Sequence, residues 1–94
     1  MKYGTIYATA GVARDAETNP EFRRDLAKAW ERYRHGDWGD LCEEDKETNE
    51  DALRCGARIL ASYQTCLGKL WIITEAEDDE GNRAATTFLY PSEY

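Results

Sequence analysis

The chain has 94 residues, of which 41% are hydrophobic and 12% aromatic, a composition typical of a folded domain rather than of a disordered chain. This length fits one domain, residues 1–94, which can bury a modest core without disulfides or metal ions. The formal net charge of -7 argues against direct binding of nucleic acid or of an anionic membrane surface.

The first third of the chain predicts one strand and one helix. Residues 2–9 carry Tyr3, Ile6 and Tyr7 among small and β-branched residues, which favours a short strand. The polar stretch 11–18 is expected to be a loop. Asn19 and Pro20 then mark a helix start, and apolar residues spaced by three or four form a stripe up to residue 34.

A second helix is expected at residues 41–55, after the connection His-Gly-Asp-Trp-Gly at 35–39. Asp40 is expected to be its N-cap, paired with Glu43 in a capping box, and Gly56 its end. Trp38 in the connection has two interpretations. It is either an exposed anchor for a partner or a residue that closes one side of the core.

Three strands are expected in the last third, at residues 58–64, 70–75 and 83–90, with turns at 67–69 and 78–82. Because no helix lies between them, they should form an antiparallel meander. The predicted fold is therefore α+β in the order β-α-α-β-β-β, an antiparallel sheet with two helices packed on one face.

The residues that usually carry chemistry are sparse. Cys42, Cys55 and Cys66 are too widely spaced for a disulfide framework or a zinc site, and we expect reduced, half-buried thiols. No nucleophile has a paired base, and no phosphate-binding glycine loop occurs. We therefore expect no enzyme, no cofactor and no metal. No apolar run approaches about 18 residues, and residues 1–11 do not resemble a signal peptide. We therefore expect a cytoplasmic protein that does not associate with membranes.

The acidic residues form two blocks on a chain that is otherwise mildly basic. The first block spans the connection and the second predicted helix: Asp37, Asp40, Glu43, Glu44, Asp45, Glu47, Glu50 and Asp51. The second lies around the last predicted hairpin loop: Glu75, Glu77, Asp78, Asp79 and Glu80.

At helical spacing, acids of the first block fall on one stripe opposite Leu41, Ala52 and Leu53. Neighbours on such a stripe lie about 5–6 Å apart, so a rigid row of carboxylates can imitate the phosphates of a nucleic acid. The alternative is a solvated surface, because acids in the first turn stabilise a helix and polar residues solvate a hairpin tip.

Four segments resemble small uncharacterised proteins of bacterial plasmids and phages, often labelled plasmid-related. They are HGDWGDLCEEDKETNEDAL, GARILASY, LWIITEAE and TTFLYPSEY, all within residues 34–94. The chain departs from the usual short connection of that group by the insertion DDEGN at 78–82. The group has no established activity, so the resemblance implies a genetic context in a bacterial host cell and no catalytic residue.

These observations predict an inhibitor of host defence, of the anti-CRISPR or anti-restriction type, that imitates nucleic-acid charge. Its partner would be a protein, a nucleic-acid-binding defence effector, and its oligomeric state is left open. The predicted contact surface comprises Asp37, Trp38, Asp40, Glu43, Glu44, Glu47, Glu50 and Asp51, supported by Glu77, Asp78, Asp79 and Glu80. The alternative is a plasmid or phage accessory protein that regulates through protein–protein contacts.

Overall fold

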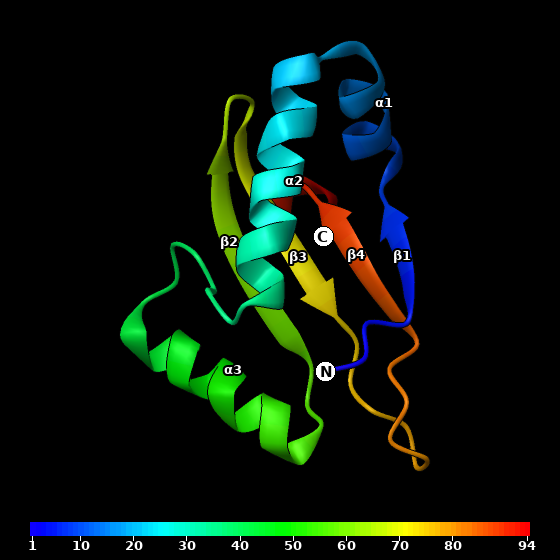
Figure 1. Cartoon of the computed structure of the whole chain (residues 1–94), viewed down its shortest axis with the longest axis vertical. Coiled ribbons are helices and arrows are strands. Elements are labelled where there is room, and N and C mark those ends of the chain that lie inside the picture. Colours follow the sequence, from blue (N-terminus) through cyan, green and yellow to red (C-terminus); the bar gives the residue numbers. More distant parts are fainter.

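A computed structural model describes all 94 residues. The elements are β1 (Thr5–Ala8), α1 (Ala10–Thr18), α2 (Pro20–Arg34), α3 (Glu43–Cys55), β2 (Ile59–Thr65), β3 (Gly68–Thr74), β4 (Ala85–Leu89) and a 3-10 turn at Pro91–Glu93. Four strands form one sheet in the order β1-β4-β3-β2, with helices on one side of it (Figure 1). The α+β class is confirmed, whereas the number of helices and the purely antiparallel sheet are wrong.

The sheet is mixed because β1 pairs in parallel with β4, while β2, β3 and β4 form the expected antiparallel meander. The tight connection between β2 and β3 explains the first hairpin, since Thr65 pairs directly with Gly68 across a two-residue turn. A longer loop, residues 75–84, joins β3 to β4 and contains no helix. Nothing in the short apolar segment at 5–8 specifies a partner strand. Its position beside β4 is set by the helices that return the chain across the sheet.

The helix α1 occupies residues expected to be a loop. Thr9 caps it, its side chain accepting a hydrogen bond from the Val12 amide, and Val12 is buried. Alanines at 10, 13 and 16 supply high helix propensity, which offsets the polar residues between them. The prediction was wrong because it weighed polarity above this propensity and the cap.

The helix α2 has the predicted bounds and the predicted start. Asn19 accepts a hydrogen bond from the Phe22 amide, and Pro20 occupies the first turn. The buried side chains of Phe22, Ala29 and Tyr33 face the sheet. They meet alternate residues of β2 and β3 in one core: Ile59, Ala61, Tyr63, Leu70 and Ile72.

The helix α3 lies beside the lower end of β2 and not over the sheet next to α2, so the layer of two helices on one face is formed by α1 and α2 (Figure 1). It begins at Glu43, after Cys42, whose side chain makes no capping bond. Asp40 is not the N-cap: its amide donates to the Ser62 carbonyl beside the Gly39–Ser62 bridge, which holds residues 39–40 against β2, and the helix begins three residues later. Gly56 ends the helix as predicted, with a φ of 79°.

Candidate functional site

The acids of α3 face outward from the molecule. The buried residues of this helix are Asn49 and Ala52, which fixes its inner side. The opposite side carries the predicted stripe, and each of its carboxylate residues is exposed: Glu43, Glu44, Glu47, Glu50 and Asp51. Leu53, expected on the inner side, is 40% exposed.

Three contacts hold α3 against the rest of the fold. Asn49 donates from its side-chain amide to the Leu60 carbonyl at 2.7 Å and accepts from the Leu60 amide at 3.3 Å. The Trp38 indole donates to the Glu50 carboxylate at 2.7 Å. The guanidinium of Arg83, which is buried, donates to the Ala52 carbonyl at 3.2 Å near the end of the helix.

Asp37 does not belong to an open acidic row, because Arg32 engages both of its carboxylate oxygens at 2.8 and 3.2 Å. The Gly39 amide donates to the same carboxylate at 3.0 Å. The bonds from Arg32 first, and then that from Gly39, hold the pKa of Asp37 below its usual range. The aspartate thus fixes the turn between α2 and the extended segment at 38–40.

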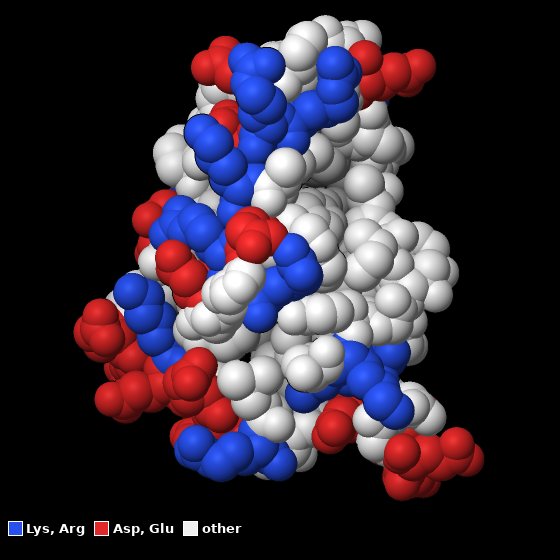
Figure 2. Space-filling view, viewed as in Figure 1, with Lys and Arg blue, Asp and Glu red and all other residues white.

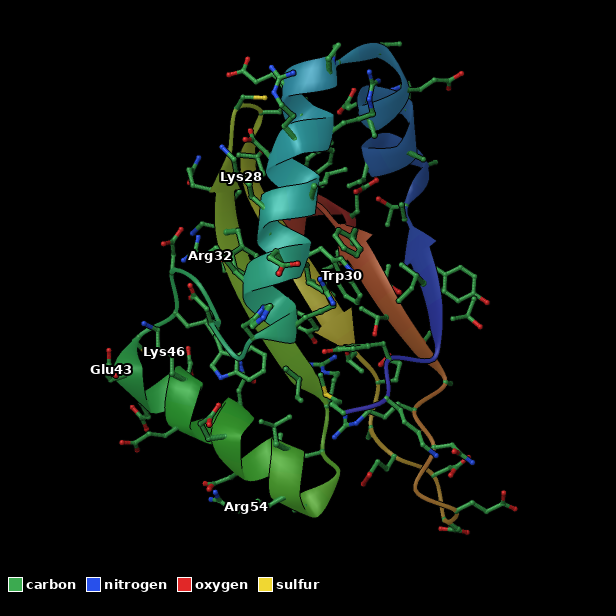
Figure 3. The ribbon with its side chains drawn as sticks, in the orientation of Figure 1. Lys28, Trp30, Arg32, Glu43, Lys46 and Arg54 are labelled. Carbon is green, nitrogen blue, oxygen red and sulfur yellow. The ribbon has the colours of Figure 1, made fainter.

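The stripe on α3 contains both paired and unpaired carboxylates. Glu43 lies 3.8 Å from Lys46, and Asp51 pairs with Arg54; Figure 3 labels Glu43, Lys46 and Arg54. Glu44 and Glu47 form no ion pair. Asp45 on the helix and Asp40 in the segment before it form none either, so these four exposed acids carry the unpaired negative charge of this region.

Trp38 is not an exposed anchor. Only 3% of it is exposed, its ring packs edge-on against Tyr33 at 5.5 Å between centroids, and its indole nitrogen is bonded to Glu50. The interpretation that this residue closes one side of the core is confirmed. Its burial also means that Glu50 is the one acid of the stripe that is bonded to the core.

The acids of the loop between β3 and β4 form a separate group. Asp78 shapes the loop by accepting hydrogen bonds from the Glu80 and Asn82 amides, each at 2.9 Å. Asp79 and Glu80 are exposed at its tip, and the Glu77 amide donates to the Gly56 carbonyl at 2.7 Å. Figure 2 shows red atoms at the lower left, over α3, and at the lower right, with white and blue atoms and one smaller red group between them. The loop-tip acids Asp79 and Glu80 therefore do not extend the stripe on α3, whereas Glu77 lies against Gly56 at the end of that helix.

Sequence reasoning missed an apolar groove beside β1. It has a volume of about 400 Å³, and all of its lining residues are hydrophobic. Ile6 and Ala8 line it from the strand, and Leu26, Ala27 and Trp30 from α2. The available signal was Ala27, an apolar residue directly beside the apolar stripe of α2, together with the short uncharged strand.

The described chain holds no group of three or more histidine, cysteine or acidic side chains able to bind a metal ion, and none of its helices has the length and apolarity to cross a membrane. All three cysteines are free and exposed, so the expectation of half-buried thiols is wrong. No family model, no curated protein and no solved structure matches this chain.

Proposed function

We propose that this protein is an acidic inhibitor that binds a nucleic-acid-binding effector of bacterial defence and occupies the basic groove in which that effector holds DNA or RNA. The resemblance of residues 34–94 to proteins of plasmids and phages supplies the biological setting. The contact would be made by the acidic face of α3, meaning Asp40, Glu43, Glu44, Glu47, Glu50 and Asp51.

One observation carries this proposal: the carboxylates lie on the outward side of a helix that is fastened to the sheet. Side chains four residues apart on a helix are about 5–6 Å from each other, similar to phosphates along a strand of nucleic acid. Because Asn49 and Trp38 fix the helix, the carboxylates are presented without the entropic cost of ordering a flexible segment.

Glu44 and Glu47 are the central pair of this surface. Both are exposed and free of ion pairs, so a basic partner would not have to displace an internal cation. Acids in the first turn, Glu44 among them, stabilise the helix, but repulsion between acids on successive turns costs an isolated helix about 0.2–0.5 kcal/mol per pair. Glu47 lies beyond the first turn, so its place in the stripe does not serve helix stability. Docking onto lysine and arginine side chains would relieve that repulsion.

The test is capture of partners from a nuclease-treated bacterial lysate by the immobilised protein. We expect retention of a nucleic-acid-binding defence protein, and its release by added DNA or RNA. Raising the salt concentration from about 0.1 M to about 1 M shortens the Debye length from about 10 Å to about 3 Å and should also release it.

The decisive variant is the double substitution Glu44→Lys with Glu47→Lys. Neither side chain bonds to the fold, unlike Glu50, whose replacement would also break the bond to Trp38. The matched control is Glu17→Lys with Glu21→Lys, which changes the net charge equally at two exposed acids on α1 and α2. Capture should be lost with the first pair and kept with the second.

Equal capture by both double variants would exclude α3 as the contact surface. A partner that resists salt and is not displaced by nucleic acid would favour the other candidate, an accessory protein of a plasmid or phage that acts through apolar protein–protein contacts.

A further inference from the structure

The two edges of the sheet are treated differently by the fold. Along β2 the outward backbone groups are covered: Asn49 bonds both the amide and the carbonyl of Leu60. Ser62 is covered next, its amide donating to the Trp38 carbonyl at 3.2 Å and its carbonyl accepting from the Asp40 amide at 2.7 Å. These four bonds close the edge at residues 60–62, which leaves too little of β2 free to pair with an added strand.

The edge formed by β1 is open. The amides of Thr5 and Thr9 donate to carbonyls of residues 84 and 88, so these residues direct their backbone groups toward β4. By the alternation of a strand, Ile6 and Ala8 direct theirs away from the sheet, and no other segment bonds them. The edge also exposes apolar side chains, since Ile6 is 50% and Tyr7 55% exposed.

The apolar groove adjoins this open edge. Ile6 and Ala8 point to the helix side of the sheet, where the layer is incomplete because α1 covers only the upper part of β1 and β4 (Figure 1). The groove floor includes Phe88, and its far wall is α2 with Leu26 and Trp30. A space-filling view shows this region as a white hollow to the right of α2 (Figure 2). A strand added to β1 would place alternate side chains over the mouth of this groove.

Basic side chains border the groove on the helix side. The guanidinium of Arg34 lies over the ring of Trp30 at 6.0 Å, and that of Arg23 bonds the Ala16 carbonyl at 2.7 Å; both Trp30 and Ala16 line the groove. Glu31 pairs with Arg34, but Arg23 has no acidic partner. The rim is therefore net positive. The acidic groups at the other end of the 39 Å molecule lie beyond the Debye length of about 8 Å at physiological salt.

From this combination we infer that β1 and the groove beside it bind an extended segment of a partner protein, which adds to the sheet as a fifth strand. The segment would carry apolar side chains at alternate positions, to enter the groove mouth, and acidic residues beside them, to meet Arg23 and the rim. This surface is distinct from the acidic face of α3, so the inference does not depend on the proposed function.

A second copy of the chain fits the basic rim of the groove less well than an acidic partner segment does. Residues 1–10, which include β1, contain Lys2 and no acid, so a β1 strand from another copy offers nothing to a basic rim. Pairing of two β1 strands about a two-fold axis would also bring both basic rims to the same side of the joined sheet.

The probe is a displayed library of random peptides about ten residues long, enough for one strand, selected on the folded protein. We expect enrichment of peptides with alternating apolar residues and flanking acids. The substitution Ala27→Arg fills the groove mouth from an exposed position of α2 and should weaken binding of the selected peptides by about tenfold or more. Ala13→Arg, at an exposed position of α1 outside the groove, is the matched control and should leave binding unchanged.

Hydrogen exchange distinguishes strand addition from other modes of docking. In the complex, the amides of Ile6 and Ala8 should become protected, because they would donate to the added strand. Circular dichroism verifies that both arginine variants keep their helices.

Three results would overturn the inference. The first is a selection that enriches no acidic-apolar peptide above the level seen with Ala27→Arg, and the second is a bound peptide that leaves the amides of Ile6 and Ala8 unprotected. The third is a concentration-dependent dimer that Ala27→Arg converts to a monomer. The last result would assign the groove to a second copy of the chain.

Discussion

Asn49 and Leu60 exchange two hydrogen bonds, one in each direction, between a helix side chain and the backbone of an edge strand. The asparagine is 4% exposed although the helix around it is strongly polar. One amide group thus fastens α3, seals part of the β2 edge and orients the acidic face outward.

Replacing Asn49 by Ala should lower the free energy of unfolding by about 1–3 kcal/mol, because the amide and carbonyl of Leu60 lose their partner in a partly buried place. Urea titration measures the loss. Thr48→Ala, at the exposed neighbouring position, is the control and should cost far less. Because the opened edge can pair with other chains, the Asn49 variant should also associate in sedimentation experiments. Equal stability of the two variants would contradict the role given to Asn49.

Gly39 and Gly36 allow a second comparison of two matched variants, because both glycines have the same backbone conformation. Both have a φ of 77°, which strains any other residue, but a Cβ on Gly39 would lie 1.9 Å from the Ser62 carbonyl oxygen, whereas one on Gly36 would meet open space. We expect Gly36→Ala to cost about 1 kcal/mol of unfolding free energy. Gly39→Ala should cost clearly more, because the segment at 38–40 must leave the edge of β2. Thermal denaturation of the two variants tests the difference.

Arg83 is a buried cation without an acidic partner. It donates to the carbonyls of Ala57 at 2.8 Å, Glu75 at 2.9 Å and Ala52 at 3.2 Å. Arg83→Met should lower the free energy of unfolding by about 2–3 kcal/mol, because three carbonyls lose a charged donor. Hydrogen exchange should show faster opening at the end of α3 before the sheet is affected. Uniform loss of protection throughout the chain would argue against this local role.

The buried phenol of Tyr33 should make the free energy of unfolding depend on pH in the alkaline range. Its hydroxyl lies 2.6 Å from the Thr74 hydroxyl, and Thr74 in turn bonds Thr86 at 2.8 Å. Burial raises the pKa of Tyr33 to about 12. In the unfolded chain the phenol ionises near pH 10, so between about pH 10 and about pH 12 the folded state holds the phenolic proton of Tyr33 more tightly than the unfolded chain does. Its stabilising contribution is complete below about pH 10 and is lost as the pH rises toward 12.

Tyr33→Phe removes this phenol without emptying its place in the core. The variant should lose less unfolding free energy than the parent protein between about pH 10 and about pH 12, as measured by urea titration at a series of pH values. Identical pH profiles for the two proteins would show that the other buried tyrosines dominate the response.

Much of the fold could be predicted where one local signal decided the outcome. Asn19 and Pro20 marked the start of α2, and Gly56 marked the end of α3, because caps depend on residues adjacent in sequence. The meander followed from the absence of a helix between its three strands. The place of β1 could not be predicted, because its partner strand lies some 80 residues away and its own four residues fit any sheet edge equally well.

The outward direction of the acidic stripe could also be predicted, since helical periodicity fixes which residues share a side. The pairing of Asp37 with Arg32 could not, because it depends on how the chain turns after α2 ends. The burial of Trp38 likewise depends on the bridge between Gly39 and Ser62, a contact that joins two distant segments.

The order of the strands also has a consequence for how the chain folds. The hairpins of β2, β3 and β4 join neighbours in sequence, whereas β1 can dock only after residues 85–89 exist and have paired with β3. During synthesis on the ribosome the first strand must therefore wait, and because its ladder closes the longest loop in the molecule, its pairing carries the largest entropic cost of loop closure.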